Sequence, residues 1–247
     1  MKIKKILVSQ PKPENDKSPF FELAKKNNLT IDFRPFIQVE GVLSKDFRKQ
    51  KVNIPEHSGV IFTSRTAVDH FFRIAKELKL VIPETMKYFC INEATAFYLQ
   101  KYIVYRKRKI FYGKGKLDDL IEVLMKHKDE KFLVPLSDIH KQDIPRKLRK
   151  NKFKFTKAIL YKTVSSDLSD LADVNYDILV FYSPSGIKSL FQNFPDFKQN
   201  EIKIASFGQS TAKAVKEAGL RLDIQAPMPK APSMTMALEN FILKHNK

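Results

Sequence analysis

The chain has 247 residues, of which 43% are hydrophobic and 29% are charged. This balance excludes an intrinsically disordered chain, and the length allows one large domain or two smaller ones. Lysine and arginine number 45 against 27 aspartates and glutamates, and the net charge of +18 favours an acidic partner, whether a polyanionic metabolite, a nucleic acid or a membrane surface. The single cysteine, Cys90, excludes a disulfide framework, and its apolar neighbours predict a buried, unreactive thiol.

Strand-like and helix-like segments alternate along the chain. The strand-like segments are short apolar runs: Ile6 to Val8, Ile31 to Val39, Val60 to Thr63, Tyr88 to Ile91, Phe132 to Val134, Ala158 to Val164, Ile178 to Tyr182 and Ile202 to Phe207. Amphipathic helices are predicted from apolar residues at helical spacing, namely Val68, Phe71, Phe72, Ala75 and Leu78, and then Ala212, Val215 and Ala218 before Gly219, a natural helix-ending residue. This alternation predicts an α/β protein with parallel sheets covered by helices.

The amino-terminal segment lacks the features of a secretory signal. Ile6-Leu7-Val8 is a short apolar run that Ser9-Gln10-Pro11 closes, with no cleavage site. No later apolar run approaches the roughly 20 residues that a membrane span needs. We therefore expect a cytoplasmic protein that does not enter a membrane.

Three segments of the first half resemble segments of the second half in the same order. The matched pairs are Ile6–Pro11 with Phe132–Ser137, Val60–Val68 with Leu179–Ile187, and Ile91–Ala96 with Phe207–Ala212. One duplicated unit explains all three matches. The two lobes need not follow the two halves of the sequence, because the extended segments Phe33 to Val39 and Ala158 to Val164 are suited to carry the chain between lobes.

Hydroxyl-bearing residues follow several of the predicted strands. Ser64 and Ser183 come directly after strands and are candidate helix N-caps, and Pro184 suits the first helical position, where its missing N–H costs nothing. In open parallel sheets, ligands bind beyond the carboxyl ends of the strands, where such turns gather. Helix capping alone is the alternative interpretation of these hydroxyls.

A further turn, Gly208-Gln209-Ser210-Thr211, closes the last of these strands. Gly208 permits close approach of the backbone, and we expect Ser210 or Thr211 to cap the following helix. An anion at one helix N-terminus gains about 0.3–1 kcal/mol, and up to about 2 kcal/mol when partly buried. Because micromolar binding requires about 8 kcal/mol, several turns must contact one ligand that carries several anionic groups.

Common cofactor motifs do not occur in the sequence. It has no phosphate-binding loop, no dinucleotide-binding glycine pattern, no H-E-x-x-H and no paired cysteines, and Gly113-Lys114-Gly115 is interpreted as a turn. The five histidines are scattered, and Asp138 with His140 is interpreted as a surface pair. The run Arg106–Lys109 is interpreted as a solvated face. Metal and nucleotide chemistry therefore have no support in the sequence motifs.

The ordered strands and turns resemble one known enzyme family along nearly the whole chain. The resemblance rests on Ile6-Leu7-Val8-Ser9, Phe62-Thr63-Ser64-Arg65, Leu160-Tyr161-Lys162-Thr163, Phe181–Gly186 and Phe207–Ala212. These segments are similar in order and spacing to those of the uroporphyrinogen-III synthase family. The resemblance implies two similar flavodoxin-like lobes with parallel sheets, joined by a two-strand connector, with a ligand cleft between them. The domains predicted are residues 1–36 with 168–247, and residues 37–167.

The resemblance also implies a lyase, a hydro-lyase of haem and other tetrapyrrole biosynthesis. The expected reaction closes hydroxymethylbilane to uroporphyrinogen III with inversion of ring D and loss of water, without a cofactor. Tyr161 matches the family's connector tyrosine and is the candidate catalytic residue, because a phenol is protonated at neutral pH and can donate to the departing hydroxyl; a packed connector tyrosine is the alternative. The candidate substrate-binding residues are Ser9, Ser64, Arg65, Thr66, Ser183, Ser185, Gly186, Gly208, Gln209, Ser210 and Thr211.

Three positions depart from the family pattern and leave their turns without assigned contacts. Gln10 replaces an arginine common in the family, Asn92 replaces a glycine, and the turn Pro135–Asp138 lacks the usual glycine. The expected protein is a monomer that binds hydroxymethylbilane and no nucleic acid, with a transient contact to hydroxymethylbilane synthase. The open alternatives are a two-lobed cytosolic binding protein for a small polyanionic ligand and, from the charge alone, a nucleic-acid binder.

Overall fold

The computed structural model describes residues 2–140, 142–172 and 175–246. The chain divides into two compact units: unit 1 comprises Met1–Gln38 and Val164–Lys247, and unit 2 comprises Val39–Thr163. Both divisions fall inside strands, in β3 (Ile37–Gly41) and β8 (Lys154–Ser165), so the ends of the compact units and of the strands do not coincide. The domain boundaries at 36/37 and 167/168 stay a prediction.

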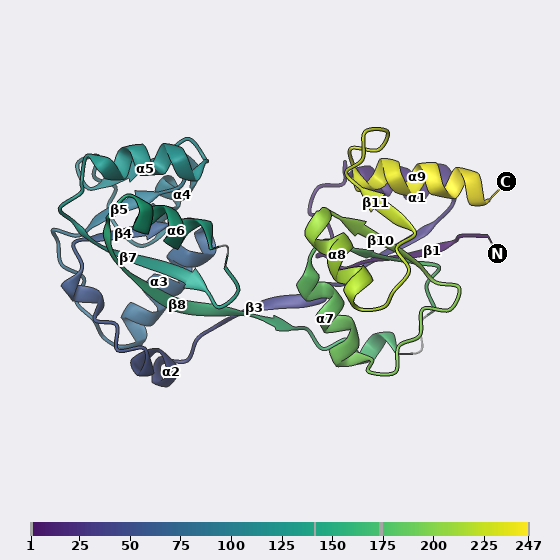
Figure 1. Ribbon diagram of the computed structural model, residues 1–247, viewed down its shortest axis with the longest axis horizontal. Helices are drawn as coiled ribbons and strands as arrows, with labels where there is room; N and C mark the ends of the chain where they lie inside the picture. Colours follow the sequence, from purple (N-terminus) through teal and green to yellow (C-terminus); the bar gives the residue numbers. More distant parts are fainter. Residues whose placement is uncertain (1, 141, 173–174, 247) are drawn as a thin grey trace. The chain divides into compact units, whose positions relative to one another are not determined.

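Unit 1 has a five-stranded sheet in the order β11-β10-β9-β1-β2, with each neighbouring pair parallel (Figure 1). Its elements are β1 (Lys5–Val8), α1 (Pro19–Asn27), β2 (Thr30–Phe33), the 3₁₀ helix η3 (Ser169–Leu171), β9 (Ile178–Phe181), α7 (Pro184–Asn193), β10 (Lys203–Phe207), α8 (Gln209–Glu217), β11 (Ile224–Ala226) and α9 (Met234–His245). Alternate residues of each strand point to opposite faces, so β1 sends Ile6 and Val8 to the core under α1 and α9, and Leu7 to the core under α7 and α8. Helices thus cover both faces of the sheet.

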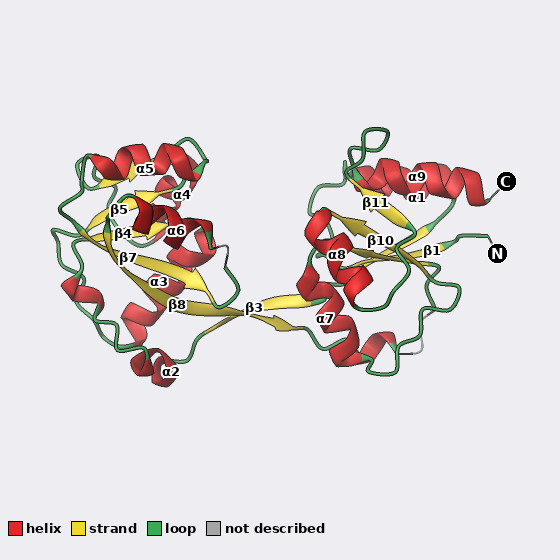
Figure 2. Cartoon of the chain, viewed as in Figure 1, coloured by secondary structure: helices red, strands yellow, loops and turns green. Residues whose placement is uncertain are grey.

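Unit 2 has a six-stranded sheet in the order β3-β8-β7-β4-β5-β6 (Figure 2). Besides β3 and β8, its elements are α2 (Ser44–Lys49), the 3₁₀ helix η1 (Ile54–Glu56), β4 (Gly59–Phe62), α3 (Arg65–Glu77), β5 (Lys87–Cys90), α4 (Glu93–Tyr98), the 3₁₀ helix η2 (Leu99–Lys101), β6 (Ile110–Tyr112), α5 (Leu117–Met125), β7 (Lys131–Ser137) and α6 (Asp143–Lys150). The strands from β8 to β6 run parallel. Hydrogen bonds from Ser166 N–H to Phe36 O and from Val42 N–H to Leu160 O place β3 antiparallel to β8.

The two sheets have the same strand order when their strands are matched by the sequence repeat. Counting from β1, unit 1 has the flavodoxin-like order 2-1-3-4-5. Unit 2 has that order when β7 is counted first and β4 third. These equivalences, β1 with β7, β9 with β4 and β10 with β5, are the pairs that the repeat predicts. The duplication is confirmed, and unit 2 is a circular permutation of the plan of unit 1.

Most predicted elements are confirmed, with one correction to the strands. The run Ile31 to Val39 forms two strands in different sheets, β2 and β3, because Pro35 between them lacks the N–H that a continuous strand would use. Helix α8 ends before Gly219, which has φ +73°, and Cys90 is fully buried, which raises the pKa of its thiol to about 12. Among the described residues, no helix is long and apolar enough to cross a membrane.

Candidate functional site

The strand order of unit 1 places one group of predicted site residues together. From β1 the chain proceeds to β2 on one side, and from β9 it proceeds to β10 on the other, so the switch point lies between β1 and β9. Ser9 follows β1, and its N–H donates to Val180 O over 2.9 Å. A Cβ added to Gly186 would lie 3.8 Å from both the Ser9 and the Ser183 hydroxyl oxygen. Ser9, Ser183 and Gly186 therefore surround one point where an open α/β sheet binds ligands.

Helix α7 begins as the sequence predicts. The Ser183 hydroxyl accepts a hydrogen bond from the Gly186 N–H over 3.2 Å, and Pro184 occupies the first helical position. The N–H of Ser185 has no acceptor among the described residues. Because this N–H lies in the first turn, it is available to an anion.

Helix α8 begins differently from the expectation. Gly208 is the N-cap, with φ +86° and ψ 152°, so Ser210 and Thr211 are the second and third helical residues and neither caps the helix; that prediction was wrong. The Thr211 side chain is only 1% exposed, which leaves its backbone N–H as the group that could contact a ligand. Gln209 and Ser210 are exposed, and their N–H groups have no acceptor within the described part of the chain.

Unit 2 has its switch point between β4 and β7. Ser64 lies just beyond β4, and its hydroxyl accepts from the Ala67 N–H over 3.1 Å, which confirms it as the N-cap of α3. Thr66 lies in the first turn of α3 and is partly buried. The exposed guanidinium of Arg65 lies 5.4 Å from the centre of the Tyr98 ring. This cation–π contact fixes the direction of Arg65 and leaves its charge at the surface.

Beyond β7, Asp138 joins its own turn to β8. Its carboxylate accepts hydrogen bonds from the N–H groups of Ile139 and Thr163 and from the Ser137 hydroxyl. Burial alone would raise the pKa of Asp138, but these hydrogen bonds and the charge of Lys162 hold it below its usual value. His140 bonds instead to the Ser137 carbonyl over 2.7 Å. Asp138 therefore organises the turn through the backbone rather than through His140.

Tyr161 lies on β8 opposite Ser137, at the carboxyl end of β7. Its side chain is partly exposed, and its ring stacks on the His70 imidazole with centroids 5.1 Å apart and planes 18° apart. The Tyr161 carbonyl accepts from the Asp138 N–H over 3.1 Å. Tyr161 therefore lies, like Ser64, at the carboxyl ends of the parallel strands of unit 2, and its side chain is accessible to solvent.

The positive charge is concentrated in unit 2. Residues 39–163 contain 28 lysines and arginines against 14 aspartates and glutamates, a net charge of +14, whereas unit 1 has 17 against 13, a net charge of +4. A field of this sign raises the local concentration of an anionic ligand and speeds its association. Among the described residues, no group of three or more His, Cys, Asp or Glu side chains is arranged to bind a metal ion.

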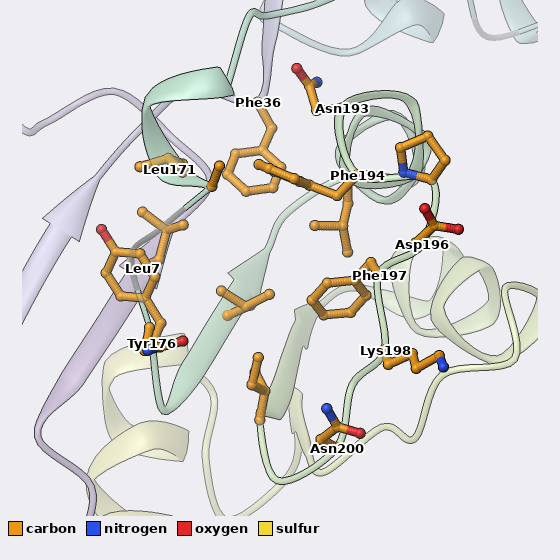
Figure 3. Close-up of a pocket in the computed structure, with 16 residues that line it drawn as sticks. Leu7, Phe36, Leu171, Tyr176, Asn193, Phe194, Asp196, Phe197, Lys198 and Asn200 are labelled. Carbon is orange, nitrogen blue, oxygen red and sulfur yellow. The ribbon is translucent and has the colours of Figure 1, made fainter.

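A cavity of about 540 Å³ in unit 1 lies at the other end of the sheet from these turns (Figure 3). Tyr176 and Ile202, just before β9 and β10, line it together with Phe36, Phe194 and Phe197. The lining is mostly apolar, and Lys198 is the one positively charged residue among the described residues that form it, so the cavity does not suit a ligand with many carboxylates. The turns at the carboxyl ends of the strands remain the candidate site.

Sequence reasoning missed two groups of residues near these turns. Asn92, which replaces a glycine of the family pattern, caps α4 by accepting from the Thr95 N–H over 2.9 Å. Asp69 accepts hydrogen bonds from the hydroxyls of Tyr98 and Tyr102 and from Lys101. The capping role was readable from Asn before an alanine-rich helix, but the Asp69 cluster joins different elements and has no local signal.

Comparisons with known proteins agree on one family. The sequence profile described as "Uroporphyrinogen-III synthase HemD" matches residues 18–236. A uroporphyrinogen-III synthase of Schizosaccharomyces pombe is 25% identical over 259 residues, covering 98% of each chain, and one of Chlorobaculum parvum is 22% identical over 96% of this chain and 98% of its own. The crystal structure of the Helicobacter pylori enzyme, 17% identical, matches with a TM-score of 0.60 over 98% of this chain and 100% of its own. A mutant from Thermus thermophilus, 16% identical, gives 0.52 over 98% and 99%.

Each of the two α/β units carries hydroxyl- and amide-rich turns at the switch point of its own sheet, and together with these comparisons this makes the chain an enzyme of the lyase class. The chain belongs to the uroporphyrinogen-III synthase family. The family and the fold that the sequence predicts are thus confirmed.

The two serine caps give a direct prediction for stability. We expect Ser64→Ala and Ser183→Ala each to lower the free energy of unfolding by about 1 kcal/mol, because each leaves one N–H of a first helical turn without its acceptor. Ser210→Ala, inside α8, should cost nothing, since alanine is the better helix former. Urea unfolding followed by circular dichroism measures all three, and a loss at Ser210 equal to that at Ser64 would contradict the assignment of Gly208 as the cap.

Three histidines of unit 2 predict a pH dependence of its stability. Burial holds the pKa values of His57, His70 and His127 below the usual value. Because the unfolded chain then binds protons more readily than the folded one, this stability is complete above about pH 6.5 and is lost as the pH falls through the folded pKa values. Amide hydrogen exchange of residues 39–163 should therefore quicken between pH 7 and pH 5 beyond its intrinsic pH dependence. His57→Asn, which keeps a hydrogen-bond donor near Asn53 O, should reduce this pH dependence. If the exchange rate of the variant varied with pH as it does in the wild-type protein, His57 would not contribute to the effect.

Proposed function

We propose that the protein closes hydroxymethylbilane to uroporphyrinogen III, with inversion of ring D and loss of water. Two equivalent sets of hydroxyl- and amide-rich turns, at the switch points of the two sheets in a chain of this family, carry the proposal. The residues proposed to bind substrate are those predicted from the sequence: Ser9, Ser64, Arg65, Thr66, Ser183, Ser185, Gly186, Gly208, Gln209, Ser210 and Thr211, the last through its backbone N–H alone.

The chemistry of the substrate suits these turns. Hydroxymethylbilane carries an acetate and a propionate on each pyrrole ring, and the turns offer hydroxyls and free N–H groups at the starts of α3, α7 and α8. One hydrogen bond to a charged group contributes about 1.5–3 kcal/mol. Several carboxylates bound at once therefore reach the roughly 8 kcal/mol of micromolar affinity. The net charge of +14 on unit 2 assists association.

Tyr161 is proposed as the proton donor. Its phenol gives a proton to the hydroxyl of the substrate, which leaves as water with the electron pair of the broken C–O bond. The last pyrrole ring attacks the resulting cation, and after rearrangement and closure the proton lost from that ring returns to the phenolate. Atoms balance with the loss of one water and no net change at Tyr161, so no cofactor is required.

The products distinguish this activity from its alternatives. The protein is incubated with freshly generated hydroxymethylbilane, and the products are oxidised and separated by chromatography. We expect the type III isomer, because the uncatalysed ring closure gives type I. Formation of type I alone, at the rate of the buffer control, would overturn the proposal. Binding of a polyanion without turnover would then favour the alternative, a two-lobed binding protein.

We further propose that this reaction takes place in the cytoplasm, with a transient contact to hydroxymethylbilane synthase. The instability of the linear substrate, which closes unaided, supports direct transfer between the two enzymes. Crosslinking of the two purified proteins during turnover tests the contact. A product ratio that does not respond to an inactive hydroxymethylbilane synthase added as a competitor would count against it.

A further inference from the structure

The ring of Tyr161 packs against the hydrophobic core of unit 2 and stacks on one histidine of helix α3. The His70 imidazole lies nearly parallel to the phenol ring, with centroids 5.1 Å apart and planes 18° apart. His70 is partly buried. The orientation of the phenol therefore depends in part on what holds the imidazole.

One guanidinium holds both the imidazole and the backbone next to the phenol. Arg73 Nε donates to His70 Nδ1 over 3.1 Å, and Arg73 Nη2 donates to the carbonyls of Val42 and Leu160 over 2.9 and 3.2 Å. Leu160 immediately precedes Tyr161 on β8. Arg73 Nη1 forms an ion pair with Glu77 at 2.5 Å, which fixes the planar group from its remaining side.

The chain leaves room for this guanidinium at one glycine. A Cβ on Gly41 would lie 2.6 Å from Arg73 Cζ and 2.7 Å from its Nε. A side chain there would displace the end of Arg73, while the rest of the fold could stay in place. Gly41 thus permits the bonds that Arg73 makes to His70 and Leu160.

The bonding also fixes the protonation of His70. Because Arg73 Nε donates to Nδ1, the neutral ring carries its proton on Nε2. Burial and the charge of Arg73 lower the pKa of His70, while Asp69 and Glu77, the acidic groups near it, raise it. On balance the imidazole is neutral at pH 7, and a second positive charge beside Arg73 is avoided.

We propose that His70 and Arg73 are positioning residues for Tyr161: Arg73 holds the His70 ring and the Leu160 carbonyl, and His70 sets the plane of the phenol. This proposal rests on the proposed function, in which the phenol donates the proton. Asp138 restrains the other side through its N–H bond to Tyr161 O and its carboxylate bond to Thr163 N–H. The phenol is thus held in place before substrate binds.

A double-mutant cycle tests whether His70 acts through Tyr161. We expect His70→Ala to lower kcat about tenfold with KM changed less than about twofold, and to have no further effect on kcat in the Tyr161→Phe background. Arg73→Lys should give a similar loss, since an ammonium cannot reach His70, Leu160 and Glu77 together. Equal losses from His70→Ala in both backgrounds would mean a merely structural role and would overturn the proposal.

Two further variants separate positioning from folding. Gly41→Ala should keep the circular dichroism spectrum and lower kcat as His70→Ala does, because the methyl displaces only the guanidinium. His127 serves as the matched control: it is also a partly buried histidine of unit 2 beside an aromatic ring, with its centroid 4.3 Å from that of Phe111 and the two planes tilted by 50°. His127→Ala should lower the free energy of unfolding. Its effect on kcat should be the same in the wild-type protein and in the Tyr161→Phe background.

A readout that needs no activity keeps the inference separate from the proposed function. In protein labelled with ¹³C-tyrosine, the Tyr161 ring resonances, assigned from Tyr161→Phe, should shift as His70 titrates below about pH 6.5. His70→Phe, which keeps a ring but no titrating nitrogen, should abolish this shift. If the protein forms only type I product, the proposed function fails while this titration still decides the positioning; a pH-independent Tyr161 resonance would refute the positioning whatever the activity.

Discussion

Tyr161→Phe lowers kcat for formation of the type III isomer about 100-fold and leaves KM nearly unchanged. This expectation follows because the substitution removes only the phenol hydroxyl, and positioned proton transfer contributes about 10²–10⁴-fold to rates. The ring keeps its stack on His70 and the backbone keeps its bond from Asp138, so substrate binding and folding should survive. Chromatography of both isomers at several substrate concentrations gives kcat and KM.

A second tyrosine of the same sheet provides the control for Tyr161. Tyr88 on β5 is 5% exposed, and its burial raises the pKa of the phenol to about 12. Tyr88→Phe removes a hydroxyl from the core of unit 2 and should leave kcat unchanged. If Tyr161→Phe kept more than a third of the activity, or if Tyr88→Phe lost as much, Tyr161 would be a packed connector residue, the alternative that the sequence leaves open.

The duplicated architecture could be predicted from the sequence because its signals are local. The matched segments lie at the ends of buried strands, and two of the three pairs continue into a helix start. Both features have strong residue preferences: apolar runs such as Ile6 to Val8, and capping serines such as Ser64 and Ser183. The permutation of unit 2 could not be predicted in this way. Strand neighbours are set by contacts between distant segments, and no local pattern reports that β7 lies beside β4.

The strands that the sequence misses are short or edge elements. β6 and β11 have three residues each and lie at the ends of their sheets. Such strands have one neighbour and a weak apolar pattern, so turns and basic residues around them dominate the local signal. The prediction of the start of α8 was wrong for a different reason. Ser210 and Thr211 are preferred capping residues, but Gly208 adopts a backbone conformation that is unfavourable for them.

The candidate site also has a part that local sequence patterns predict and a part that only the tertiary packing shows. Ser9, Ser183 and Gly186 were predicted from separate turns, and the sheet of unit 1 brings them together. The contacts of Tyr161 were not predicted, because His70 and Arg73 read as ordinary residues of an amphipathic helix. Only the packing of α3 against β8 shows which of its polar residues meet the phenol.

Gly208→Ala raises KM about tenfold and lowers the free energy of unfolding by roughly 1–3 kcal/mol. With φ +86° and ψ 152°, Gly208 occupies a backbone region that is essentially restricted to glycine. A Cβ there would meet nothing within 4 Å, so the cost is conformational rather than steric. Relief of the strain moves the start of α8, and the loss of one charge-assisted bond to a substrate carboxylate corresponds to at least about a tenfold change in affinity.

Gly219, at the other end of the same helix, isolates the effect on binding. It has φ +73°, and a Cβ there also meets nothing within 4 Å, so Gly219→Ala should cost about 1–2 kcal/mol of stability. Because the carboxyl end of α8 presents carbonyls rather than N–H groups, KM should not change. Urea unfolding and steady-state kinetics on both variants make the comparison. Equal changes in KM would show that Gly208 acts through the stability of unit 1 alone, and α8 would then have no part in holding the substrate.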